Sequence, residues 1–106
     1  MVLDRTYRIV ALSGPGAFMF GFPDAAQAIG LSLHELPLLD FSADAGALPD
    51  EEINRIPPAL ALNPGVQARA VLRVWTGLTP RTIDAVSTPL RDGSAVVGSL
   101  TFFTVV

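Results

Sequence analysis

An Asp-Gly pair between two alternating segments constrains the fold of this chain more than any other feature. Asp92 and Gly93 stand between residues 82–90 and 95–105, in which apolar and polar side chains alternate. An Asp-Gly pair in such a setting is the strongest short-range signal for a β-hairpin. We therefore predict two long antiparallel strands joined by a tight turn. A third strand should precede them, because residues 66–75 alternate in the same way.

The register of this hairpin decides which side chains face the core. If Asp-Gly itself is the two-residue loop, Ala85 faces Leu100 on an apolar face, whereas Phe103 points to the mixed face opposite. A slip by one residue would exchange the two faces. The same pairing predicts that Arg73 of the preceding strand lies near Asp84. Such a surface ion pair contributes little to stability.

The chain resembles a PAS domain along most of its length. Residues 87–98, Ser-Thr-Pro-Leu-Arg-Asp-Gly-Ser-Ala-Val-Val-Gly, are similar to the hairpin that ends that family's sheet. Residues 8–12, 20–22 and 28–36 resemble its second strand and short helices, in the same order. The resemblance implies an α+β fold, in which short helices pack on one face of a five-stranded antiparallel sheet. It also implies signal sensing and protein contact within a bacterial sensor kinase or transcription regulator.

Length and composition set further limits. A chain of 106 residues predicts one domain, residues 1–106, and we interpret it as excised from a larger signalling protein. Its net charge of -3 gives no basic footprint for direct nucleic-acid binding. The chain has no cysteine, so disulfides, thiolate nucleophiles and zinc-thiolate sites are excluded. No apolar run reaches the roughly 18 residues of a membrane span, and we predict a cytoplasmic domain without membrane insertion.

Short helices are predicted between an N-terminal hairpin and the terminal strands. The hairpin falls within residues 1–12, and Ser13 or Gly14 can cap the helix that follows. Ser32 and Glu35 form a capping-box pattern at a later turn. Residues 48–62 then predict a helix with an acidic first turn, which suits the helix dipole. Its Pro57 should end or kink it.

No catalytic or metal site emerges from the sequence. His34, the one histidine, has haem ligand, metal ligand and general base as its functional readings, and we interpret it as a surface residue. Haem-binding members of the family carry their histidine on the helix that corresponds to residues 48–62, which has none here. Flavin-cysteinyl photochemistry is excluded because there is no cysteine. We therefore predict no cofactor, no metal and no enzymatic activity.

The resemblance implies a pocket between this helix and the inner side of the sheet. A small apolar or uncharged ligand would lie there, and a change on binding would pass through the sheet to its outer face. The predicted pocket residues are Ile53, Ile56, Leu72, Ala85, Leu100 and Phe102.

The outer face of the sheet is too apolar to remain bare, and contiguous apolar surface marks an interaction site. We predict that it contacts a second protomer or flanking helices, with Trp75 and Phe103 as anchors. The predicted interface residues are Val71, Trp75, Val86, Val97, Phe103 and Val105.

Two other functions stay open at this point. The chain could be a ligand-free dimerisation module of the same fold, which an inner face filled by Phe and Leu side chains would favour. A small α+β enzyme is the remote alternative, because the sequence holds no convergent acid-base pair.

Overall fold

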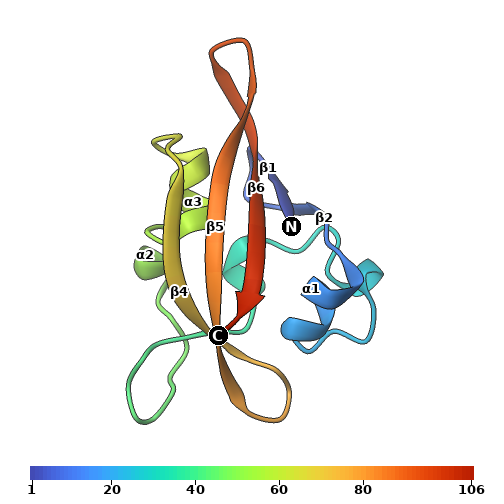
Figure 1. Cartoon of the computed structure of the whole chain (residues 1–106), viewed down its shortest axis with the longest axis vertical. Helices are drawn as coiled ribbons and strands as arrows, with labels where there is room; N and C mark the ends of the chain where they lie inside the picture. Colours follow the sequence, from blue (N-terminus) through green and yellow to red (C-terminus); the bar gives the residue numbers. More distant parts are fainter.

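Six antiparallel strands form one curved sheet in the computed structural model, which describes residues 1–106 (Figure 1). The strands are β1 (Val2–Asp4), β2 (Ile9–Ala11), β3 (Leu38–Leu39), β4 (Ala68–Trp75), β5 (Pro80–Asp92) and β6 (Ala95–Val105). Their order across the sheet is β2-β1-β6-β5-β4-β3. The predicted α+β class and the terminal meander are confirmed. The predicted count of five strands is wrong, because the short β3 adds to the edge of β4.

Three short helices and two 3-10 turns connect these strands. They are α1 (Gly14–Met19), α2 (Asp50–Ile53), α3 (Pro57–Leu62), η1 (Ala25–Gln27) and η2 (Leu33–Glu35). Helices α2 and α3 lie by β4, whereas α1 lies beside β6, on the right in Figure 1. Helix α3 packs against β4, β5 and β6. No helix is both long and apolar enough to cross a bilayer.

The helix starts follow from the predicted caps. The side chain of Ser13 accepts a hydrogen bond from the Gly16 amide at 3.1 Å, and Ser32 and Glu35 form the capping box at η2. The helix predicted over residues 48–62 is two helices instead. Helix α2 ends at Ile53, and α3 begins at Pro57, whose ring suits a first helical position and not an interior one.

The hairpin register differs from the predicted one, and the difference reverses the faces of β6. Asp92 pairs with Ala95, which leaves Gly93 and Ser94 as the loop. The ladder then shifts by one residue on β6, between the pairs Arg91 with Val96 and Leu90 with Gly98. Such a bulge inserts one unpaired residue, here Val97, and exchanges the two faces of the strand beyond it.

The bulge places Phe103 opposite Ala85 on the inner face. Phe102, which was predicted to face inward, lies opposite Val86 on the outer face with 64% of its surface exposed. Asp84 pairs with Arg69 and not with Arg73 as predicted, at 2.6 Å between Nη2 and Oδ2.

The core lies between the inner face of the sheet and the helices and loops that cover it. Phe20 and Phe103 pack edge to face within it, with ring centroids 5.2 Å apart. The buried cluster comprises Leu3, Ile9, Phe20, Ala28, Leu33, Leu36, Leu38, Ile53, Ile56, Ala59, Leu72, Val74, Ile83 and Ala85.

Candidate functional site

Three hydroxyl side chains are buried together on the inner face of β5 and β6. Ser87 lies opposite Thr101, and their hydroxyl oxygens are 2.7 Å apart in a buried hydrogen bond. Ser99 precedes Thr101 by two residues, so it shares the same face. Its side chain is fully buried, and its Oγ has no hydrogen-bond partner. We call Ser87, Ser99 and Thr101 the hydroxyl cluster.

Two members of this cluster were not predicted. The predicted register, which pairs Ala85 with Leu100, also turns Ser87 inward, but it places Ser99 and Thr101 on the outer face with Phe103. The bulge at Val97 turns both of them inward. The alternation of the sequence does not indicate this bulge. The one local signal is Gly98, which directly follows the bulged residue. A Cβ atom at Gly98 would lie 2.6 Å from the carbonyl oxygen of Leu3, so β1 approaches β6 closely there.

The residues of the predicted pocket are divided between the core and the outer face. Ile53, Ile56, Leu72 and Ala85 are buried in the core. Leu100 and Phe102 lie on the other side of the sheet and line the groove beside α1, whereas Ile56 and Leu72 line a different groove beside β4, so the predicted set does not surround one space. No cavity in the structure is lined by Ile53 or Ala85. Whether the four core residues contact a ligand stays a prediction.

A surface groove of about 190 Å³ reaches one member of the hydroxyl cluster, Thr101, and is not lined by Ser87 or Ser99. It runs between α1 and β6, and Thr101 lines it although that residue is only 1% exposed. Its other walls include Ser13 and Met19 from the α1 side and Phe103 from β6. This groove is the one opening that reaches a member of the cluster.

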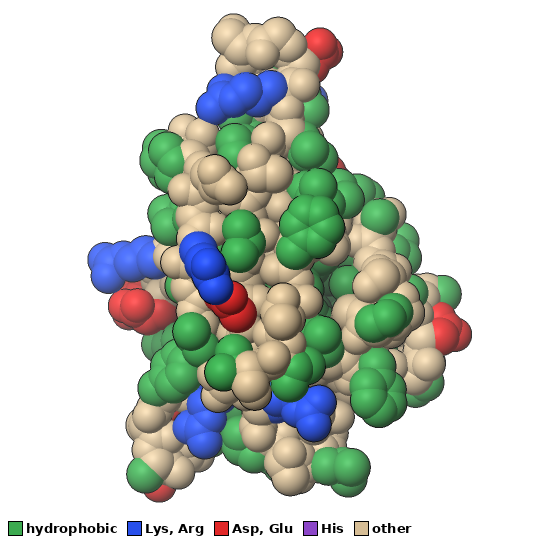
Figure 2. Space-filling view, in the orientation of Figure 1, with side chains coloured by type: hydrophobic (Ala, Val, Ile, Leu, Met, Phe, Trp, Pro, Cys, Tyr) green, Lys and Arg blue, Asp and Glu red, His purple; other side chains and the backbone are tan.

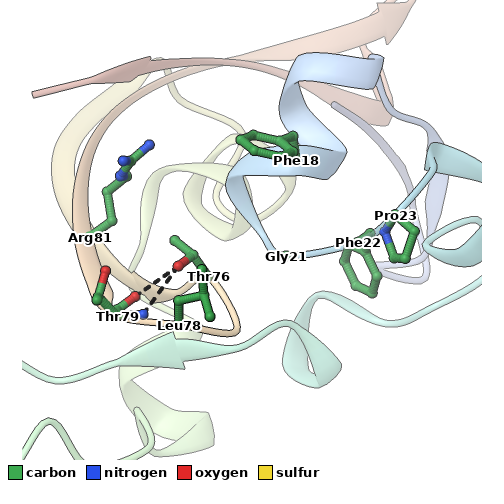
Figure 3. Close-up of a pocket in the computed structure, with 8 residues that line it drawn as sticks. All are labelled: Phe18, Gly21, Phe22, Pro23, Thr76, Leu78, Thr79 and Arg81. Carbon is green, nitrogen blue, oxygen red and sulfur yellow. Dashed lines mark hydrogen bonds between the residues drawn. The ribbon is translucent and has the colours of Figure 1, made fainter.

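A larger recess of about 350 Å³ lies at the end of the sheet, between α1 and the loop that joins β4 to β5 (Figure 3). Phe18 and Phe22 come from the α1 side, and Arg81 comes from β5 (Figure 3). The two sides touch through Gly21, where a Cβ atom would lie 2.5 Å from the carbonyl oxygen of Thr76. The recess is open to solvent and lies apart from the predicted pocket residues, none of which lines it.

The outer face carries most of the predicted interface. Val71 and Trp75 are exposed on β4, and Val86 on β5 is half-buried. Figure 2 shows this face, where hydrophobic side chains lie between a few charged ones. Two assignments are wrong because of the bulge: Phe103 lies on the inner side, where it is partly buried against the core, and Val105 lies opposite Ile83 on the same side. Val97 is the bulged residue itself and is exposed, and Phe102 takes the place of Phe103 on the outer face.

The side chain of His34 is positioned by two polar contacts and one aromatic contact. Its Nε2 lies 2.8 Å from Oδ1 of Asn54, and its Nδ1 lies 3.2 Å from the hydroxyl of Ser32. The ring also lies beside that of Tyr7, at 5.8 Å between centroids. These contacts link η2 to the end of α2. No group of three His, Cys, Asp or Glu side chains lies close enough to hold a metal ion.

Two solved structures of VqmA resemble this chain. The first is the Vibrio cholerae VqmA dimer without its target DNA, described as a LuxR-type receptor, and the second is VqmA bound to DPO. Both superpose with a TM-score of 0.74 at 17% identity over 99% of this chain. The chain spans 44% and 50% of the two receptor chains. This likeness fits a PAS-like fold. No protein-family model matches the chain, and no curated protein does.

Proposed function

We propose that this chain is the cytoplasmic sensory domain of a larger bacterial regulator. A small uncharged molecule would bind at the inner face of its sheet, and the outer face would pass the resulting change to a partner. The likeness to VqmA supports this proposal, because one of those structures holds a bound ligand, DPO. The proposal assigns the chain no enzymatic activity, no haem and no flavin adduct.

The hydroxyl of Ser99 is the observation that carries the proposal. A buried hydroxyl without a hydrogen-bond partner costs about 1–3 kcal/mol of stability. A ligand that pairs with Ser99 would recover that cost, and the neighbouring Thr101 would give it a second polar contact. The groove along α1 supplies a route to Thr101 from the surface.

The ligand should be uncharged. The buried polar side chains are Ser87, Ser99 and Thr101, and none of them carries a charge. An ionised ligand group placed there would be desolvated without a counter-charge, which is strongly unfavourable. A small, mainly apolar molecule with one or two hydrogen-bonding groups suits the cluster and the hydrophobic core around it.

The partner would be a second protomer or flanking helices on the outer face, with Trp75 and Phe102 as anchors. An effector domain, a kinase or a DNA-binding module, would belong to the parent protein. The VqmA structures support the DNA-binding choice, since one is described as a dimer and with a target DNA. This chain would itself touch neither nucleic acid nor membrane.

A ligand-free dimerisation module is the second candidate. It is favoured by the packing of Ile53, Ala85 and Phe103 in one core, with no cavity lined by Ile53 or Ala85. In that case the hydroxyl cluster would be a structural feature, and the outer face would be the functional one.

Native mass spectrometry separates the two candidates. The protein would be measured as purified, after incubation with a bacterial small-molecule extract, and after incubation with DPO, each time against its denatured mass. An added mass that denaturation removes, and that Ser99→Val loses while the turn variant Ser94→Val keeps it, supports the sensor. A bare dimer under all three conditions favours the dimerisation module, and a bare monomer contradicts both.

A further inference from the structure

The recess at the end of the sheet has one wall built by the end of α1 (Figure 3). The helix ends in a Schellman motif, in which the amide of Phe22 donates to the carbonyl of Ala17 at 2.9 Å. The amide of Gly21 donates to the carbonyl of Phe18 at 3.0 Å, and Gly21 takes the left-handed φ of 80° that this motif requires. The motif turns the chain back, so that Phe18 and Phe22 both line the recess.

The opposite wall is the closed turn between β4 and β5. The hydroxyl of Thr76 donates to the carbonyl of Thr79 at 3.0 Å and accepts from the amide of Thr79 at 3.3 Å (Figure 3). The turn leaves Leu78 with 86% of its surface exposed, and Phe18 on the first wall is 75% exposed. Covering such apolar surface is favourable, so the recess suits a ligand with an apolar body.

Arg81 is the one charged residue that lines the recess, and it has no counter-charge. Asp24 follows a lining residue in the sequence, but it caps η1 and does not line the recess. Asp84 lies on the opposite face of β5 and pairs with Arg69. Five other arginine side chains donate to oxygen atoms of the protein: Arg8, Arg55, Arg69, Arg73 and Arg91. The guanidinium of Arg81 is therefore free to bind an anion.

We propose that this recess binds a small monocarboxylate with an apolar or aromatic body. The planar guanidinium of Arg81 matches the two carboxylate oxygens, and the body lies between Phe18 and Leu78. A phosphate fits less well, because about two negative charges at neutral pH would face a single positive one. The volume of about 350 Å³ lies at the lower end of the range for small-molecule sites. The recess shares no residue with the groove at the hydroxyl cluster, so its failure to bind would leave the proposed function unchanged.

Titration of the full chain with phenylacetate, followed by NMR of the ¹⁵N-labelled protein, tests the proposal. Saturable shifts should appear at the amides of Gly21, Leu78 and Thr79 and at the side-chain Nε–H of Arg81, with a Kd in the millimolar range. Phenylacetamide has the same body without the charge, and it should bind roughly fivefold more weakly. Phenylethylamine, with the opposite charge, and acetate, without the apolar body, should cause no saturable shift at equal concentration.

Two arginine variants separate the recess from the charge of the whole protein. Arg81→Gln should weaken phenylacetate binding roughly fivefold, with the circular dichroism spectrum unchanged. Arg5→Gln is the matched control, because Arg5 also forms no salt bridge but lies outside the recess, and it should leave the Kd unchanged. If Arg81→Gln unfolds, the comparison of phenylacetate with phenylacetamide decides instead, because it uses the unchanged protein.

Three results would overturn the proposal. The first is the absence of saturable shifts at Gly21, Leu78 and Thr79 with millimolar phenylacetate. The second is equal binding of phenylacetate and phenylacetamide, or an equal loss in the Arg81 and Arg5 variants, because Arg81 would then not recognise the carboxylate. The third is a set of shifts confined to the hydroxyl cluster, which would assign the carboxylate to that site.

Discussion

Phe20 and Phe103 meet edge to face, with ring planes at 86° and centroids 5.2 Å apart. The contact joins the end of α1 to β6, and it depends on the bulge that turns Phe103 inward. Aromatic pairs in this geometry contribute about 0.5–1.5 kcal/mol beyond the area that they bury. The pair therefore belongs to the stability of the fold and not to a protein interface.

Phe103→Ala should lower the free energy of unfolding by about 2–3 kcal/mol, because it removes a partly buried ring that packs on Phe20 and the core. Phe102→Ala is the matched control, since its ring is mostly exposed, and it should change the stability by less than about 0.5 kcal/mol. Urea unfolding measures both. A larger loss in Phe102→Ala than in Phe103→Ala would show that β6 has the predicted register and not the bulged one.

Ser99→Ala should leave the free energy of unfolding unchanged or raise it, because the variant removes a buried hydroxyl that has no partner. Ser87→Ala should lower it by about 1–3 kcal/mol, because the hydroxyl of Thr101 then loses its hydrogen bond. The same unfolding experiment on the ligand-free protein compares them. A large loss in Ser99→Ala would mean that this hydroxyl already has a partner.

Phe102→Asp and Trp75→Asp should each turn a dimer into a monomer while the fold stays intact, since a charge on the apolar outer face opposes its burial. Analytical ultracentrifugation reports the assembly, and circular dichroism reports the fold. Ser94→Asp, in the exposed turn between β5 and β6, is a control for added charge. An unchanged oligomeric state in both aromatic variants rejects the outer-face interface.

The carboxylate of Asp4 should add to stability above about pH 4 and lose that contribution in acid. The hydroxyl of Thr6 and the amides of Arg8 and Thr6 donate to it, and these bonds lower the pKa of Asp4 below its usual value. A lowered pKa in the folded state means that protonation, as pH falls through that value, weakens folding. Asp4→Asn should therefore flatten the fall in melting temperature below about pH 4, and an unchanged pH profile would contradict this.

The sequence predicted the parts of the fold that depend on local chemistry. The caps at Ser13 and Ser32, the break at Pro57 and the strands around Asp92-Gly93 are all decided by residues within a few positions of each other. Alternation also predicted correctly that Leu72 and Val74 face inward on β4.

The predictions that were wrong concern features that depend on contacts between distant segments. The bulge at Val97 accommodates β1, which approaches β6 at Gly98, and no pattern near residue 97 reports that approach. Strand β3 is two residues long, so it is too short to alternate, and its pairing with β4 defines it. The bulge also determines that Ser99 and Thr101 face inward, so the hydroxyl cluster was not predicted either.

The single extra residue at Val97 also affects how this chain can be compared with others. An alignment that places its gap elsewhere in the hairpin would match inward positions of β6 with outward positions of a relative, from Gly98 to the end of the strand. A conservation score from such an alignment would compare a buried hydroxyl of this chain with a solvent-facing residue of the relative. Proteins that share this architecture are therefore better matched strand by strand, with the bulge fixed first, than by overall residue identity.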